Sequence, residues 1–234
     1  MSGGMTEQAT APFDPLADPR KLAWFGEVAR RRLIGHPAVE PLCLEGAEVF
    51  LVRGFLKRRD CRDLVEAINR KAEPSPLYRS SELPAYRTSY THHFANDDPL
   101  PHSCEQYIAD LLGIDLAHSE RMQGQRYTAG QEFKHHYDYI ETDRDYWQVE
   151  GPRGGQRTWT AMVCLNQPAE GGETDFPELG LSVRLPTGAM LVWNNMTPEG
   201  HPNPRTRHAG MPVRRGVKHV ITKWFRQEPC RWMF

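Results

Sequence analysis

The second half of the chain is divided into short β-prone runs by turns rich in glycine and proline. The runs are Thr158–Leu165, Leu181–Leu185, Ala189–Trp193 and Val217–Phe225, and the turns include residues 170–172, 186–188 and 215–216. Short strands at this spacing are typical of a β-sandwich or jelly roll. A chain of 234 residues has room for one such domain with a good-sized core.

The first half shows the apolar spacing of helices. Asp18 followed by Pro19 is typical of an N-cap and the first helical residue. From there to Gly35 the apolar residues share one helical face, and they are Leu22, Phe25, Ala29 and Leu33. The spacing predicts a helix that packs against a core.

Further elements follow in the first half. Residues 48–52 (Glu-Val-Phe-Leu-Val) predict a strand. Asp60 to Ala72 predicts a helix that buries Leu64, Ala67 and Ile68. Cys104 to Leu112 predicts another, which buries Tyr107, Ile108 and Leu111 and ends at Gly113.

These elements predict an all-β core with flanking helices (α+β), in which the helices pack on one face. Residues 1–17 are mostly small, polar or proline, so we expect a flexible tail there. Residues 18–234 are expected to form a single domain. Its helical support would span about 18–118 and its β core about 119–228.

Composition narrows the classes of partner and compartment. Lys and Arg total 29 against 30 Asp and Glu, which gives no reason to expect nucleic acid or an anionic membrane as partner. Five cysteines without CxxC pairing favour a reducing compartment. The chain shows neither a signal peptide nor an apolar run of the roughly 18 residues that span a bilayer, so we expect a cytoplasmic protein. The sequence indicates no oligomeric state.

A pair of metal-ligating residue types stands two positions apart at His136 and Asp138. In an extended strand such residues point to the same side, so both can reach one ion, whereas the neighbouring His135 points to the opposite face. We take His208 as the third ligand because Lys218 follows it by ten residues. Two histidines and one carboxylate form the ligand set of non-haem Fe(II) oxygenases.

The last predicted strand carries a lysine among apolar neighbours. Lys218, Val220, Thr222 and Trp224 alternate onto one face, so the lysine and the tryptophan would face the same cavity. A buried ammonium is costly unless it is paired. A bound oxo-acid with a distal carboxylate would pair it.

Three motifs occur in order along the chain. They are Tyr127-x-x-Gly130-Gln131-x-Phe133-x-x-His136-x-Asp138, then Gly171-Gly172-x-Thr174-x-Phe176-Pro177, then His208-Ala-Gly-x-Pro212-Val213 leading to Lys218 and Trp224. This order resembles the prolyl 4-hydroxylase branch of the Fe(II)/2-oxoglutarate-dependent dioxygenases, whose pattern is YxxGQxYxxHxD, GGxTxFP and HAGxPVxxGxKxxxxxW. The resemblance extends more weakly back to about Val49 and covers most of the chain.

The resemblance implies a double-stranded β-helix, the jelly roll of cupin-like proteins, with Fe(II) on His136, Asp138 and His208. It implies that Lys218 holds 2-oxoglutarate, that Tyr127 and Thr174 contact this co-substrate and that Trp224 encloses it. The implied reaction uses O2, converts 2-oxoglutarate to succinate and CO2, and hydroxylates a C–H bond, with ascorbate as reductant. Because Asp138 keeps a carboxylate where halogenating relatives lack one, we expect hydroxylation.

The substrate is the open part of the prediction. Proline in a peptide or protein is the first expectation, and a free amino acid or other small molecule is the alternative. Phe133, where many relatives have tyrosine, and Arg157 are candidate substrate contacts. A sensor of iron, oxygen or 2-oxoglutarate without turnover is a hypothesis from another class, and a zinc-binding cupin-like protein is a third, which Lys218 disfavours.

Two surface features accompany the predicted site. Four arginines cluster around His208 in the sequence, namely Arg205, Arg207, Arg214 and Arg215. They predict either a solvated basic rim or a lip that attracts an acidic substrate. Residues 139–156, rich in acidic and aromatic side chains, are a candidate lid.

Overall fold

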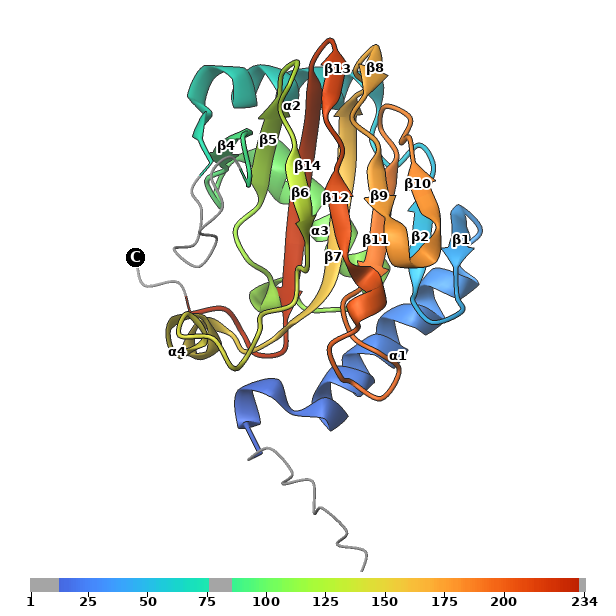
Figure 1. The fold of residues 1–234 in the computed structure, drawn as a ribbon, viewed down its shortest axis with the longest axis vertical. Coiled ribbons are helices and arrows are strands. Elements are labelled where there is room, and N and C mark those ends of the chain that lie inside the picture. The colour runs from blue at the N-terminus through green and yellow to red at the C-terminus, as the bar shows by residue number, and fades with distance from the viewer. Residues whose placement is uncertain (1–12, 76–85, 232–234) are drawn as a thin grey trace, which may run out of the picture.

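Two antiparallel β-sheets face each other at the centre of the molecule (Figure 1). The computed structural model describes residues 13–75 and 86–231. In spatial order the large sheet contains β1 (Val39–Cys43), β2 (Val49–Val52), β11 (Met190–Asn194), β7 (Arg157–Asn166), β14 (Lys218–Arg226), β5 (Gln123–Tyr127), β4 (Tyr90–His93) and β3 (Glu73–Pro74). The small sheet contains β10 (Leu181–Val183), β9 (Thr174–Phe176), β12 (His208–Gly210) and β6 (Phe133–His136). A separate ribbon pairs β13 (Val213–Arg215) with β8 (Glu170–Gly171).

Helices cover the side of the large sheet that faces away from the small sheet (Figure 1). They are α1 (Pro19–Gly35), α2 (Arg58–Lys71) and α3 (Pro99–Leu112), and a single turn, α4 (Trp147–Glu150), lies in the segment before β7. Short 3₁₀ turns are η1 (Pro15–Ala17), η2 (Leu116–His118), η3 (Gly151–Arg153), η4 (Pro177–Leu179) and η5 (Pro204–Thr206). This arrangement confirms the predicted jelly-roll core with helices on one face.

The central strands are buried on both faces because each separates two apolar cores. On β7, Trp159, Ala161 and Val163 pack toward the helices. Met162 and Cys164, at the alternate positions, pack toward the small sheet. Successive side chains of a strand point to opposite faces, so a strand between two cores is apolar throughout. The apolar run in the sequence reflects this position.

The first helix forms as the sequence predicts. The Asp18 carboxylate accepts a hydrogen bond from the backbone N–H of Arg20, and Pro19 is the first helical residue. The four predicted apolar residues Leu22, Phe25, Ala29 and Leu33 are all buried. The helix α1 therefore packs through the face that the spacing indicated.

The third helix differs from its prediction. It begins at Pro99, five residues before the predicted start, and its buried face includes Pro101, Cys104 and Ile108. Tyr107, which was predicted to be buried, is 71% exposed. The buried positions form one face of the helix, and Tyr107 lies outside this face although it is only three residues from Cys104; the buried residues are Pro101, Cys104, Glu105, Ile108, Ala109 and Leu112.

The expected helical support, about residues 18–118, contains more strands than the one predicted at residues 48–52. Four strands from the first half, β1 to β4, belong to the large sheet. The edge strand β1 is half exposed and contains Pro41, so it lacks a continuous apolar run. This explains why its sequence gave no strand pattern.

The sequence predicted a flexible tail over residues 1–17, of which residues 1–12 lie outside the described part. For the remaining residues the prediction is wrong, because they contact the rest of the chain. Asp14 accepts a hydrogen bond from the Trp147 indole at 2.7 Å, and the Pro15 carbonyl accepts one from Gln227 at 2.7 Å. These tertiary contacts order η1, because a turn of three residues is too short to be stable by itself.

In the described ranges, no helix is both long and apolar enough to cross a membrane.

Candidate metal and co-substrate site

The three predicted ligands meet between the two sheets. His136 on β6 and His208 on β12 are direct partners in the antiparallel register of the small sheet. Asp138 lies two residues beyond His136, just past the end of β6. The potential ligand atoms of all three residues lie within 4.8 Å of one another. The structure thus brings together residues that are up to 72 positions apart in the chain.

The distances suit a single ion. His136 Nε2 lies 3.7 Å from Asp138 Oδ1, and His208 Nε2 lies 3.7 Å from Asp138 Oδ2. Donors that bind an ion at about 2.1 Å are separated by at most about 4.2 Å, so both separations are compatible with one shared ion. The side chains present therefore fit a metal site of two imidazoles and one carboxylate.

Backbone carbonyls orient both imidazoles. His136 Nδ1 lies 2.7 Å from the Lys134 carbonyl and His208 Nδ1 lies 2.9 Å from the Thr206 carbonyl. A carbonyl oxygen only accepts, so each Nδ1 donates, and each neutral ring presents the lone pair of Nε2 toward Asp138. This tautomer is the one that a metal ligand requires here.

Burial sets the protonation states of the ligands. It lowers the pKa of His136 to about 3, with a further contribution from the neighbouring His208. Burial opposes ionisation of Asp138, but His208, His136 and Arg157 outweigh it, so the pKa of this carboxyl lies below its usual value. At neutral pH the site therefore offers a neutral imidazole at His136 and a carboxylate at Asp138.

Lys218 faces this cluster from the large sheet. It lies on β14, opposite Tyr127 of β5 in the strand register, and only 6% of the residue is exposed. Its ammonium lies 5.9 Å from the Tyr127 ring centroid and, within the described residues, forms no hydrogen bond or ion pair. Burial lowers its pKa to about 8. A buried cation without a carboxylate partner is costly, and this cost favours an anionic ligand.

One pocket connects the ligand cluster with Lys218. The predicted site residues that line it are His136, Asp138, His208, Lys218, Tyr127, Thr174, Trp224 and Phe133. Val220, Thr222 and Trp224 line it together with Lys218, as the alternation along β14 predicted. The pocket therefore contains every predicted metal and co-substrate residue.

Phe133 and Arg157, the two predicted substrate contacts, differ in position. Phe133 lines the pocket and stacks on the His136 ring, with centroids 3.6 Å apart. Arg157 is not among the lining residues, and its guanidinium pairs with Glu120 at 2.5 Å while donating to the Asp138 carbonyl at 3.3 Å. A direct substrate contact stays a prediction for both residues, and the contacts of Arg157 indicate a supporting position behind Asp138.

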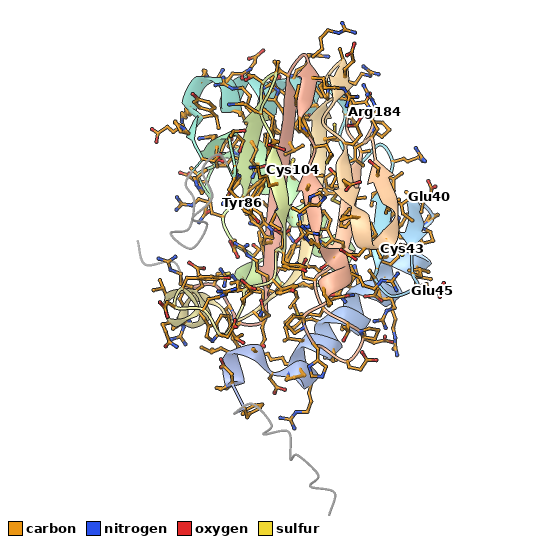
Figure 2. All side chains as sticks on the ribbon, in the orientation of Figure 1. Glu40, Cys43, Glu45, Tyr86, Cys104 and Arg184 are labelled. Carbon is orange, nitrogen blue, oxygen red and sulfur yellow. The ribbon has the colours of Figure 1, made fainter. Side chains whose placement is uncertain are left out.

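His135 points away from the cluster, as strand alternation predicted. Its Nε2 lies 3.1 Å from Asp175 on β9, on the outer face of the small sheet. Its backbone carbonyl accepts a hydrogen bond from Tyr86, whose position beside this sheet is labelled in Figure 2. The arginines expected near His208 are partly neutralised, because Arg207 lies 3.8 Å from Glu178 and Arg215 lies 2.8 Å from Glu170.

Several residues in and beside the pocket were not predicted. Arg87 lines the pocket, with its guanidinium 4.9 Å from the Phe133 ring centroid. Trp193 also lines it and contacts the His208 ring edge-on at 4.8 Å. Thr160 donates a hydrogen bond to Asp138. Each lies in a segment whose local pattern is that of an ordinary strand or loop, so no motif distinguished it.

Comparison with known proteins agrees with the geometry. A family model described as the 2OG-Fe(II) oxygenase superfamily matches residues 122–226, which include every predicted metal and co-substrate residue. Probable prolyl 4-hydroxylase 10 of Arabidopsis thaliana is 31% identical over 196 residues, which cover 74% of this chain and 66% of that protein. Prolyl 4-hydroxylase subunit alpha-1 of Mus musculus is 29% identical, over 79% of this chain. The chain spans about a third (33%) of the length of that subunit.

Solved structures show the same fold. The viral collagen prolyl hydroxylase of Paramecium Bursaria Chlorella virus-1, in complex with 2-oxoglutarate, has a TM-score of 0.60 and 26% identity, and covers 83% of this chain and 98% of its own. A Pseudomonas putida prolyl-4-hydroxylase has a TM-score of 0.53 at 18% identity, covers 88% of this chain and 98% of its own, and supports the fold alone. The chain therefore belongs to the 2OG-Fe(II) oxygenase superfamily.

Proposed function

We propose that this protein is an Fe(II)/2-oxoglutarate-dependent dioxygenase that hydroxylates proline in a peptide or protein. The observation that carries the proposal is the convergence of His136, Asp138 and His208 opposite the buried ammonium of Lys218. Relatives named as prolyl 4-hydroxylases support the choice of substrate. A jelly roll alone would not, because one fold hosts many functions.

The residues have distinct roles in this proposal. His136, Asp138 and His208 hold Fe(II) on one side, and Lys218 pairs with the distal carboxylate of 2-oxoglutarate. Tyr127 and Thr174 contact the co-substrate and Trp224 encloses it, in keeping with their places in the pocket wall. When bound, iron and 2-oxoglutarate supply the oxidising chemistry, in which O2 and 2-oxoglutarate yield succinate, CO2 and one hydroxyl on the substrate. The chain binds, orients and excludes water.

The position of Phe133 bears on the substrate. Its ring stacks on His136, with the Arg87 guanidinium 4.9 Å from its centroid, so it presents an apolar surface without a hydroxyl. An apolar wall beside the metal ligands suits the ring of a prolyl residue, which has no side-chain polar group. A free amino acid would instead bring two charged groups into this pocket.

The test is an assay of purified protein with Fe(II), ascorbate as reductant and 2-oxoglutarate. Succinate release that depends on a proline-containing peptide, with a gain of one oxygen atom in the peptide by mass spectrometry, is the expected result. If free proline is hydroxylated better than the peptide, the substrate is a small molecule and the peptide assignment is wrong. Metal binding without succinate from any substrate would favour a sensor.

Asp138→Ala tests the metal site within the same assay. Removal of one ligand should abolish both hydroxylation and succinate release, because two imidazoles alone do not complete the ligand set. The control is Asp115→Ala, whose carboxylate caps η2 away from the pocket. Full activity in Asp138→Ala would contradict the proposal.

We also propose a reducing compartment such as the cytoplasm. All five cysteines are free thiols in the structure, and three of them are buried. This supports a protein that folds without disulfides.

A further inference from the structure

Asp138 is the one proposed metal ligand that lies outside a strand. His136 and His208 belong to paired strands, whereas the chain leaves the small sheet after His136. A carboxylate on a loop can rotate unless other side chains hold it. The holding contact comes from the opposite sheet, where Thr160 of β7 donates its hydroxyl to Asp138 Oδ2 at 2.8 Å.

A second residue fixes the direction of this hydrogen bond. Asn195 donates from Nδ2 to Thr160 Oγ1 at 3.0 Å, and both residues are fully buried. Ionised Asp138 can only accept, so Thr160 gives its proton to Asp138 and accepts from Asn195. The Asn195 Oδ1 atom, also buried, has no hydrogen-bond partner within the described ranges. The Asn195 amide group therefore directs its NH2 group toward Thr160, while its oxygen has no hydrogen-bond donor within the described ranges.

This chain of donors determines how the carboxylate faces the imidazoles. With Oδ2 held by Thr160, Oδ1 lies 3.7 Å from His136 Nε2 and Oδ2 lies 3.7 Å from His208 Nε2. Rotation of the carboxylate would break the Thr160 hydrogen bond and change both separations. The hydroxyl therefore acts on the geometry of the ligand set.

We infer that Thr160 and Asn195 are positioning residues that hold Asp138 in the orientation required to bind the metal. The inference rests on the proposed metal site and extends it to two residues outside the motifs. Neither residue lines the pocket, so neither contacts the substrate. Outer-shell partners of metal ligands commonly change metal affinity by about 10- to 100-fold when they are removed.

The test measures metal affinity directly, without turnover. Mn(II) is titrated into the full-length apoprotein by calorimetry, in the absence of 2-oxoglutarate and O2. Thr160→Val, which keeps the side-chain shape and removes the hydroxyl, should weaken Mn(II) binding by about 10- to 100-fold. Thr160→Ser, which restores the hydroxyl, should return the affinity to within a few-fold of the original.

The matched control is Thr158→Val. Thr158 lies on the same strand, is equally buried, and donates to the Phe225 carbonyl instead of to Asp138. It should lower the melting temperature about as much as Thr160→Val while leaving Mn(II) affinity unchanged. An unchanged affinity in Thr160→Val, or an equal loss in Thr158→Val, would overturn the inference.

Asn195 is tested through a double-mutant cycle. Asn195→Ala should weaken Mn(II) binding when Thr160 is present and add little in the Thr160→Val background, because it acts through that hydroxyl. Equal losses of Mn(II) affinity in both backgrounds would show that Asn195 does not act through Thr160.

Asp138→Ala separates this inference from the proposed function. If Asp138→Ala loses Mn(II) binding and Thr160→Val does not, only the positioning role fails. If Asp138→Ala binds Mn(II) as well as the unaltered protein, the metal site itself fails, and with it the proposed function.

Discussion

The Lys218 ammonium lies inside the molecule without a carboxylate partner within the described ranges. A protein that buries such a charge gives up hydration energy that only a ligand can restore. The co-substrate named in the description of the superfamily is 2-oxoglutarate, and we propose that its distal carboxylate pairs with this ammonium. Binding of the co-substrate should therefore depend strongly on this single side chain.

Lys218→Ala should raise the apparent KM for 2-oxoglutarate by orders of magnitude, because a desolvated charge pair is lost. The measurement is succinate release as a function of 2-oxoglutarate concentration. Arg215→Ala, which removes an exposed cation paired with Glu170, is the control and should leave this KM unchanged. An unchanged KM in Lys218→Ala would show that the distal carboxylate of 2-oxoglutarate does not pair with Lys218.

The pKa of Lys218 predicts a pH dependence. Burial lowers this pKa to about 8, so the ammonium is charged below pH 8 in the free protein and loses its proton above it. Binding of the carboxylate requires the charged form, so above pH 8 binding must take up a proton. The KM for 2-oxoglutarate should be flat below pH 8 and rise up to about tenfold per pH unit above it. In Lys218→Arg, which stays charged, a rise of the same size would show that another group is responsible.

At the scale of elements, the contact between α2 and β5 depends on a missing side chain. Gly124 lies on β5, and a Cβ atom there would lie 2.5 Å from Ile68 Cγ1 and 2.9 Å from Phe94 Cε2. Ile68 and Phe94 are themselves fully buried. The helix therefore approaches the sheet as closely as glycine allows, and β5 carries Tyr127 into the pocket.

Gly124→Ala should destabilise the fold by about 1–3 kcal/mol, because the added methyl group overpacks this contact. Urea denaturation measures the change in the free energy of unfolding. Gly35→Ala is the control, since a Cβ atom at the end of α1 meets no atom within 4 Å. Equal stability of the two variants would show that α2 moves away from the sheet at little cost.

At the scale of the whole molecule, a network of charges joins one end of β7 and one end of β14 to α4 and to the segment before β5. Glu120 pairs with Arg226 at 2.6 Å and with Arg157 at 2.5 Å, and Arg226 also pairs with Glu150 at 2.6 Å. Burial opposes ionisation of Glu120, but the two guanidinium groups outweigh it and lower its pKa to about 2. Through Arg157 the network reaches the backbone of Asp138.

Glu120→Ala should destabilise the protein by about 3–5 kcal/mol, because it leaves the buried guanidinium of Arg226 and the partly buried one of Arg157 without this carboxylate. Denaturant unfolding at neutral pH measures the loss. The exposed pair of Glu170 and Arg215 serves as control, and Glu170→Ala should cost at most about 1 kcal/mol.

The same network predicts the acid limb of stability. Glu120 has a pKa of about 2 in the folded protein against an ordinary value of 4.5, so it stabilises the fold above pH 4.5. This contribution should fall as the pH drops from 4.5 toward 2, because the unfolded chain then binds the proton first. Unfolding curves across this range should show a larger loss of stability in the original protein than in Glu120→Ala, in which other buried carboxylates such as Asp138 still contribute.

The sequence by itself determined the features that depend on local period and motif order. Alternation along a strand placed Lys218 and Trp224 on one face and turned His135 away from His136. Helical spacing predicted the buried face of α1. These patterns are readable because side-chain direction follows from the backbone geometry of a single element.

Tertiary structure alone decided which elements face each other. Thr160 and Asp138 are 22 positions apart, and Asn195 is a further 35 away, yet the three form one chain of hydrogen bonds. Arg157, predicted as a substrate contact, is paired with Glu120 instead of lining the pocket. Such contacts depend on the pairing of distant strands and on the packing of two sheets, which leave no periodic trace in the residues of either partner.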